Sequence, residues 1–211
     1  MVNTDVNAQR QRVRSSQLAA PNATYISVEA DPLTADSLEN NIAANSIGNV
    51  TVVRGAVVST DAPPVMDLLL LDLEPSVPTG AYLSAGTEGI KNRPAARAVR
   101  VDTVPVTELV GDSDLIKLDI EGYEAKALES GWSFVLDTRL TIVVEVRRDV
   151  PHSWNFIREL LAADYAVLAV DADRLHQLSD AEVESSGPLP RFGSRDAVLM
   201  ARERTAEWQS S

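Results

Sequence analysis

The sequence predicts an α/β fold built on a mostly parallel sheet that closes with a C-terminal antiparallel strand. Between residues 25 and 165, short apolar segments typical of strands alternate with amphipathic segments typical of helices. The last two strand-like segments, 165–170 and 197–201, are separated by residues that hold no clear long helix. That pattern favours an antiparallel closing pair over a further strand–helix–strand unit.

The first predicted unit runs from residue 25 to residue 53. Segment 25–29, YISVE, has the composition of a short strand. Asp31 and Pro32 begin a helix with proline at its first position, and Gly48 marks its end. A second strand follows at 50–53 and is closed by Gly55. Strand, helix and strand in this order predict a parallel pair.

The later elements are justified by apolar runs and by the residues that interrupt them. Segment 75–94 is rich in proline, glycine, serine and threonine and is expected to be a long loop. A helix at 123–130 is expected to end at Gly131, and Ser153 is expected to cap a helix whose apolar face carries residues 154, 157, 160 and 161. The strands predicted in this part of the chain are 65–73, 98–101, 115–120 and 140–146.

Composition restricts the possible functions. The chain has 211 residues, which favours one domain over residues 1–211, and the first 24 residues form a polar segment that is expected to be poorly ordered or truncated. Its net charge of −12 argues against nucleic-acid and anionic-membrane partners. It has no cysteine, so a thiolate zinc site is excluded. It has no apolar leader and no membrane-spanning run, so a cytoplasmic location is expected.

The chemistry is expected at the carboxyl ends of the strands, where open α/β sheets bind ligands. Glu29, Asp119 with Glu121, and Glu145 stand at such ends, and Gly55 follows another strand. We therefore expect these strand ends to converge on one edge of the sheet. A strand-end acid can bind both hydroxyls of a nucleotide ribose, although Glu29 could instead serve only the dipole of the following helix.

The segment 115–124, LIKLDIEGYE, is the most specific in the chain. Strand alternation places Lys117 and Asp119 on one face, opposite an apolar face. Gly122 permits a sharp turn that would leave Asp119 and Glu121 exposed to a ligand. The alternative is a helix N-terminus with acidic residues that only complement its dipole.

These segments resemble the FkbM-type methyltransferase family, which uses S-adenosylmethionine. The resemblance covers roughly residues 25–165, and segment 114–124 carries the characteristic run of isoleucine-lysine-x-aspartate-x-glutamate-glycine-x-glutamate. Segments 28–32, 99–104 and 143–146 are similar to other parts of the family pattern. The resemblance implies a class I, Rossmann-type methyltransferase fold with seven strands, the last one antiparallel, and methyl transfer to a hydroxyl.

The same resemblance implies roles for individual residues. Glu29 and the adjacent Ala30 would bind the cofactor, with Glu29 on the ribose. Gly55 and Ala56 would lie by the adenine. Asp119 and Glu121 would lie near the methyl donor and the acceptor.

The chain departs from this family at its start. The family opens with a strand and a glycine loop that cradles the methionine part of the cofactor, whereas this chain has no glycine before Gly48. Segment 5–11 is the only candidate remnant. The first strand is therefore expected to be absent or irregular. Of three repairs (pairing by residues 2–6, direct closure, or a second chain), we expect direct pairing of 25–29 with 115–120.

Two functional hypotheses follow. The first is an S-adenosylmethionine-dependent O-methyltransferase that acts on a small molecule or sugar, with Asp119, Glu121, Glu145 and His152 as candidate bases. His152 could equally be a surface histidine. The second is a catalytically deficient, methyltransferase-like binding module. A third interpretation, another Rossmann-type nucleotide binder, is disfavoured because no G-x-G-x-x-G is present. The clustered carboxylates could also bind a divalent cation, although no dedicated metal ligands are assigned, and a homo-oligomer stays open.

Overall fold

The computed structural model describes residues 2–3, 22–71, 81–83, 95–111, 113–120, 122–146, 151–171, 174–185 and 195–209. The strands are β1 Val2–Asn3, β2 Tyr25–Glu29, β3 Val50–Arg54, β4 Ala56–Val58, β5 Val65–Leu71, β6 Ala81–Leu83, β7 Ala95–Pro105, β8 Leu115–Leu118, β9 Thr141–Glu145, β10 Tyr165–Asp171, β11 Arg174–Leu178 and β12 Asp196–Ala201. The helices are α2 Pro32–Ala44, α3 Val106–Val110, α4 Glu124–Glu129, α5 Trp132–Thr138, α6 Pro151–Ala162, α7 Asp180–Ser185 and α8 Arg202–Gln209.

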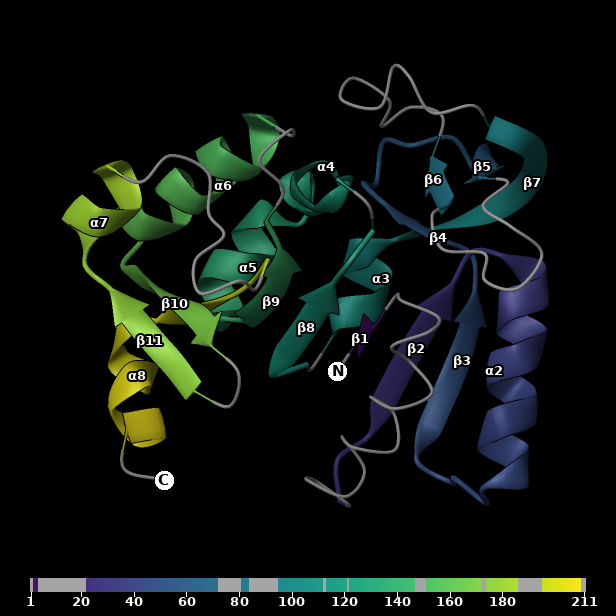
Figure 1. Cartoon of the computed structure of the whole chain (residues 1–211), viewed down its shortest axis with the longest axis horizontal. Helices are drawn as coiled ribbons and strands as arrows, with labels where there is room; N and C mark the ends of the chain where they lie inside the picture. Colours follow the sequence, from purple (N-terminus) through teal and green to yellow (C-terminus); the bar gives the residue numbers. More distant parts are fainter. Residues whose placement is uncertain are drawn as a thin grey trace.

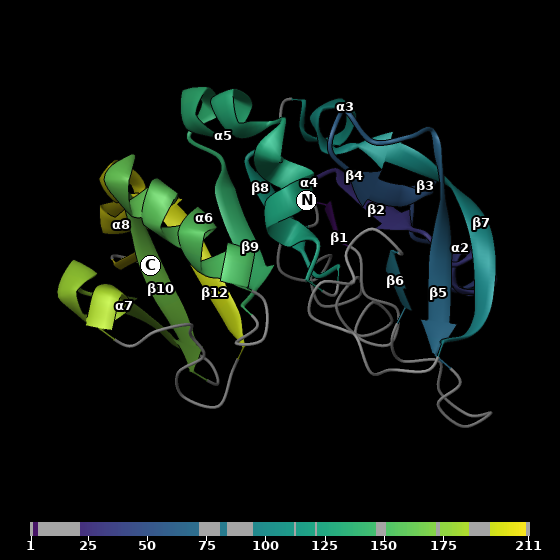
Figure 2. The same cartoon turned by 90° about the horizontal axis from the view of Figure 1, so that it is seen from above.

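The chain folds into an α/β structure with mixed sheets. One sheet has the order β1-β2-β3 with parallel pairing, and another has the order β11-β10-β12-β9-β8. Strand β1 lies beside β8, so the two sheets meet there (Figures 1 and 2). β8 and β9 are parallel, whereas β12 is antiparallel to both β9 and β10. The predicted antiparallel closing pair is therefore confirmed, and the mostly parallel sheet is found in part.

The predicted direct pairing of 25–29 with 115–120 is wrong. β2 already has a partner on each side, because β1 pairs with one of its edges and β3 with the other. Val2 aligns with Ile26 and Asn3 with Ser27. This short piece of backbone occupies the position between β2 and β8, which is the irregular first strand of the prediction. A buried strand edge left without hydrogen bonds would be costly, which explains why even two residues are used there.

The middle of the chain contradicts the prediction that strands and helices alternate throughout 25–165. Between β3 and α3 the described chain forms a further sheet with the order β4-β7-β5-β6. β5 pairs antiparallel with both β6 and β7, and only the pairing of β4 with β7 is parallel. The connection from β4 to β5 contains Pro63 and Pro64, which cannot continue a helix, so the chain returns directly as a strand.

Several helix boundaries and C-terminal elements also differ from prediction. The predicted end of the helix before Gly131 is confirmed, because α4 ends at Glu129 with Ser130 as its C-cap, but a further helix, α5, begins immediately after the glycine. Ser153 is not a cap, because α6 begins at Pro151, whose fixed φ suits the first helical position. The long connection predicted between the last two strands contains β11 and α7, and α8 follows β12. These short, polar elements lack the apolar periodicity that makes a helix or strand visible in a sequence.

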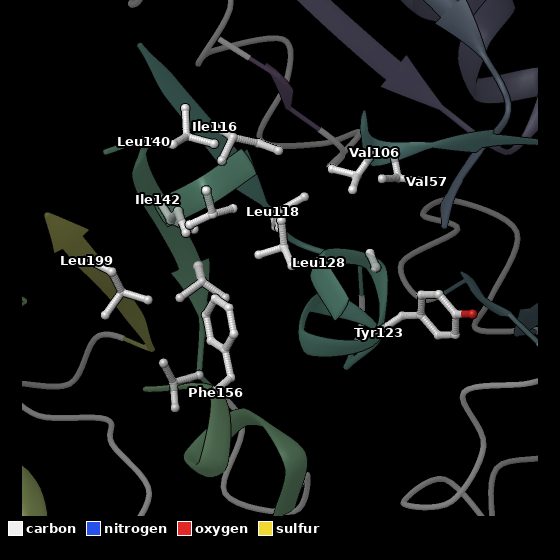
Figure 3. Packing of buried hydrophobic residues seen from close by; sticks show 14 of the residues in the cluster. Val57, Val106, Ile116, Leu118, Tyr123, Leu128, Leu140, Ile142, Phe156 and Leu199 are labelled. Carbon is white, nitrogen blue, oxygen red and sulfur yellow. The ribbon is translucent and has the colours of Figure 1, made fainter. Parts of the chain in front are cut away.

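The main core lies between the sheet and helices α4 and α6 (Figure 3). Ile116 and Leu118 of β8 face Leu128 of α4, and Ile142 of β9 lies beside them. A second, smaller apolar cluster contains Val143 and residues of β10 and β12. Because side chains alternate along a strand, Val143 and Ile142 face opposite sides of the sheet. Lys117, which is aligned with Val143, therefore belongs to the side of the second cluster.

Candidate functional site

The candidate site lies where β2, β8 and β9 end. Figure 1 shows β2 and β8 pointing in the same direction, so Glu29, the last residue of β2, and Asp119, the residue after β8, stand at the same edge. Leu118 is aligned with Val144 in the parallel pair β8–β9, which places Asp119 next to Glu145. The predicted convergence of these strand ends is therefore confirmed for the described residues. Glu121 lies outside them.

A network of charged side chains occupies this edge on the face opposite the main core. Lys117 Nζ lies 2.9 Å from Asp119 Oδ2 and 3.9 Å from Asp196 Oδ1. Asp196 begins β12 and is aligned with Glu145, whose carboxylate lies 3.4 Å from the guanidinium of Arg195. Asp196 and Arg195 were not predicted as site residues, because only the antiparallel register of β12 brings them here.

Lys117 is the centre of this network. Its side chain is only 10% exposed, and that of Asp119 is 15% exposed. A lysine in a buried strand costs desolvation unless a carboxylate compensates its charge. The ion pair therefore fixes both side chains and accounts for the polar residues in an otherwise apolar strand.

The chain leaves β8 through a tight turn that ends at the start of α4. The N–H of Tyr123 donates to the carbonyl of Ile120 at 3.3 Å, and Gly122 has a φ of +96°, in the left-handed region that favours glycine. The carboxylate Oε1 of Glu124 accepts the N–H of Ile120 at 2.9 Å and that of Gly122 at 3.1 Å. The glycine predicted to make this turn does so.

Glu124 was not singled out as a site residue, although it closes the segment 115–124. It is 1% exposed. Its pKa is raised to about 7, chiefly by burial and to a smaller extent by the nearby Asp119, while the backbone amides of the turn oppose the shift. The other carboxyl oxygen, Oε2, is buried without a hydrogen-bond partner among the described residues. Glu124 could have been recognised from the sequence as an acid on the same face of α4 as the apolar residues that face the core.

The turn after β8 is tied to the loop that follows β4. Tyr123 is 5% exposed; burial raises its pKa, and its hydroxyl makes a hydrogen bond with Ser59 that opposes the shift. Figure 3 shows this hydroxyl pointing away from the other labelled core side chains. Ser59 also donates to Asp61, and the N–H of Thr60 donates to Ser130 Oγ at 2.8 Å. The loop is thus held at both ends of α4.

At the end of β2, Glu29 is 6% exposed and its Oε1 accepts the N–H of Asp31 at 2.8 Å. Asp31 Oδ2 accepts the hydroxyl of Thr34 at 2.8 Å, whereas its Oδ1 is buried without a hydrogen-bond partner among the described residues. Ala30, between the two acids, is half-buried. Glu29 thus supports the first turn of α2, in agreement with the alternative that it serves the helix dipole. It also lies beside Asp31 Oδ1, the buried acceptor.

Gly55 and Ala56 lie next to this strand end. The N–H of Gly55 donates to the carbonyl of Glu29 at 2.9 Å, and Ala56 is buried. A Cβ on Gly55 would come within 2.7 Å of Val104 Cγ2. The close approach of β7 therefore accounts for a glycine here, and a role by the adenine stays a prediction.

Two predicted residues and the remnant of the glycine loop cannot be placed. Glu121 and segment 5–11 lie outside the described residues, and the same holds for the side chain of His152, whose backbone is in the first turn of α6. Within the described part of the chain, no group of three or more histidine, aspartate or glutamate side chains could hold a metal ion. The divalent-cation hypothesis therefore stays a prediction.

The residues around β2 fit S-adenosylmethionine in part. Its ribose hydroxyls and adenine amino group are hydrogen-bond donors, and the buried Oδ1 of Asp31 is an acceptor that lacks a donor among the described residues. An acid at a strand end, as at Glu29, is the group that nucleotide-binding folds direct to a ribose.

Among the described helices, none combines the length and apolar character needed to span a membrane.

Comparison with known proteins identifies the family. A family model of the methyltransferase FkbM domain matches residues 8–167. The crystal structure of methyltransferase FkbM from Methylobacillus flagellatus KT superposes with a TM-score of 0.51 and 13% sequence identity, over 94% of this chain and 43% of that one. Precorrin-6y C5,15-methyltransferase from Geobacter metallireducens GS-15 gives a TM-score of 0.41 and 14% identity, over 94% of this chain and 76% of that one.

No curated protein shows a significant sequence match. The chain spans less than half the length of the FkbM structure, and at 13% identity that likeness establishes a shared fold. The family model covers most of the chain, including the strand-end acids Glu29, Asp119, Glu121 and Glu145 and the segment 115–124. The chain belongs to the FkbM methyltransferase family.

Proposed function

We propose that this chain is an S-adenosylmethionine-dependent O-methyltransferase that acts on a hydroxyl of a small molecule or sugar. The observation that carries the proposal is the arrangement of Glu29 and Asp119. They stand at the ends of β2 and β8, the strands on either side of β1, and both strands end at one edge of the sheet. This is the edge at which open α/β sheets bind nucleotide-like ligands.

The proposed cofactor site is centred on the end of β2. Glu29 would accept hydrogen bonds from the ribose, and Asp31 Oδ1 would accept one further donor. Ala30, Gly55 and Ala56 would line the same end of the site. When bound, S-adenosylmethionine supplies an electrophilic methyl group.

The acceptor would be held at the ends of β8 and β9. Methyl transfer requires the acceptor oxygen at roughly 3–3.5 Å from the methyl carbon and a base that takes the hydroxyl proton. We propose Asp119 and Glu145 as the bases, because both stand at these strand ends and the ion pair with Lys117 orients Asp119. Glu121 and His152 are proposed as additional candidates from the sequence.

An acceptor with little negative charge fits this edge best. Asp119, Glu145 and Asp196 are compensated by Lys117 and Arg195, so acids outnumber bases in the network. With a net charge of −12 in the whole chain, a polyanionic acceptor would be repelled. We therefore propose a neutral alcohol or sugar hydroxyl as the acceptor group.

One observation favours a binding module without catalysis as the second candidate. The chain has no glycine before Gly48, so the methionine part of the cofactor cannot be cradled by a glycine loop from this region. Each backbone hydrogen bond lost there would weaken binding by about 0.5–1.5 kcal/mol. We expect the affinity for S-adenosylmethionine to be weaker than micromolar for this chain.

Calorimetric titration with S-adenosylmethionine tests the proposal. We expect saturable binding, and Glu29→Gln should weaken it by roughly tenfold to a hundredfold, because hydrogen bonds to a charged group contribute about 1.5–3 kcal/mol. Glu39→Gln is the matched control, since Glu39 lies on α2 and its side chain is exposed and paired with Arg54. No detectable binding by the unaltered chain would refute the first hypothesis and support the second.

A further inference from the structure

Glu124 is buried, acidic and not used by the proposed reaction. It belongs to the characteristic segment 115–124, yet its side chain faces the protein interior and is 1% exposed. A carboxylate is expensive to bury, and burial raises the pKa of this one to about 7. A helix can gain from an acid in its first turn while leaving it in solvent, so the helix dipole does not explain why this carboxyl is buried.

The hydrogen bonds of Glu124 are directed backwards along the chain. Its Oε1 accepts the N–H of Ile120 at 2.9 Å and the N–H of Gly122 at 3.1 Å. Ile120 is the residue directly after Asp119, and Gly122 holds the positive φ that reverses the chain. A single oxygen therefore fixes the backbone on both sides of the turn that delivers Asp119 to the edge of the sheet.

The position of Glu124 is itself fixed by its surroundings. Helix α4 contacts both α6 and β4. The preceding Tyr123 is anchored through Ser59, and the helix end is anchored by the bond from Thr60 to Ser130. The carboxyl is thus carried by a rigid element, which is the requirement for holding a neighbouring loop in one geometry.

We propose that Glu124 is a positioning residue of the methyl-transfer site, which clamps the amides of Ile120 and Gly122 and thereby sets the direction of Asp119. This inference rests on the proposed function. It adds a residue that acts through the backbone and does not touch substrate or cofactor.

The test compares two substitutions of similar size. Glu124→Gln keeps the Oε1 acceptor, whereas Glu124→Met keeps the length and volume but removes it. Glu129→Met is the matched control, because Glu129 ends the same helix and its side chain is 65% exposed. Hydrogen exchange of individual amides is measured by NMR, and S-adenosylmethionine binding is measured by calorimetry on the same samples.

We expect Glu124→Gln and Glu129→Met to retain slow exchange at Ile120 and Gly122 and to bind the cofactor within about threefold of the unaltered chain. In Glu124→Met the two amides should exchange about tenfold faster or more, because both hydrogen bonds are lost. The affinity should fall about tenfold, because Asp119, which the proposed site has near the methyl donor, loses its fixed direction. Equal exchange and equal affinity in the glutamine and methionine variants would overturn the inference.

The exchange measurement separates this inference from the proposed function. If the unaltered chain does not bind S-adenosylmethionine, the proposed function fails, while the amides of Ile120 and Gly122 still show whether the clamp exists. If Glu124→Met does not fold, the unaltered chain and Glu124→Gln together decide the matter. Fast exchange of both amides in the folded protein would refute the clamp, and slow exchange in both it and Glu124→Gln would support it.

Discussion

Removing the positive charge of Lys117 is the sharpest test of the charged network at the sheet edge. Lys117→Met keeps most of the side-chain volume but leaves Asp119, 2.9 Å away, and Asp196, 3.9 Å away, without that cation. Removing one partner of a buried ion pair costs about 3–5 kcal/mol. Because the side chains of Asp119 and Asp196 keep 15% and 30% exposure, we expect a value near the lower end, about 3 kcal/mol.

Urea unfolding at neutral pH of Lys117→Met, Asp119→Asn and the double variant measures this interaction directly. The double variant should lose less stability than the sum of the single variants, with a coupling energy of about 1–3 kcal/mol. Lys126→Met is the control, because the exposed pair of Lys126 and Glu129 should contribute no more than about 0.5 kcal/mol. Additive effects of Lys117→Met and Asp119→Asn, within about 0.5 kcal/mol, would refute the ion pair.

Three further predictions concern other parts of the fold. Arg139→Ala should lower the thermal unfolding midpoint by several degrees, because Arg139 binds the carboxylate of Glu203 and two backbone carbonyls. This pairing lowers the pKa of Glu203 to about 2, so the unaltered chain should lose more stability than the variant as pH falls from about 4.5 to 2. The pKa of Glu124 is about 7 in the folded chain against 4.5 in the unfolded chain, so its contribution to the free energy of unfolding falls as pH rises from about 4.5 to 7. The difference in this free energy between the unaltered chain and Glu124→Gln should therefore change with pH within that range and stay constant outside it. Gly55→Ala should destabilise by about 2 kcal/mol or more in urea unfolding, because of its φ of +154° and the 2.7 Å approach to Val104; a change below about 0.5 kcal/mol would contradict this.

The sequence predicted best those elements whose local pattern and burial agree. Segment 25–29 is β2 in full, and the apolar runs at 115–120 and 140–146 contain β8 and β9. Pro32 follows the first of these strands and Gly122 follows the second, and each marks where its strand ends. Residue pattern was therefore sufficient to assign these strand ends to one edge, because parallel strands share their carboxyl edge.

Elements that depend on distant pairing could not be predicted in the same way. β1 has two residues, and no period can be recognised in so short a piece; it is a strand because β2 offers it a hydrogen-bonding edge. β4, of three residues, exists because β7 lies beside it. Asp196 could not be predicted for the same reason: the distant pairing of β12 with β9, and its register, bring it to the site.

Asp119 is held from two directions by residues of its own segment, and the periodicity of the strand explains how. Alternation sends Ile116 and Leu118 into the main core and leaves Lys117 on the face of Asp119, where their charges pair. After the turn, the helical direction of α4 returns Glu124 to the inner side, where it binds the backbone of the residue after Asp119. A side-chain contact on one face and a backbone contact behind it together leave this carboxylate little freedom to turn. The proposed role of Asp119 as a base would benefit from this restriction, because a displacement of about 1 Å in a reacting group can cost two orders of magnitude in rate.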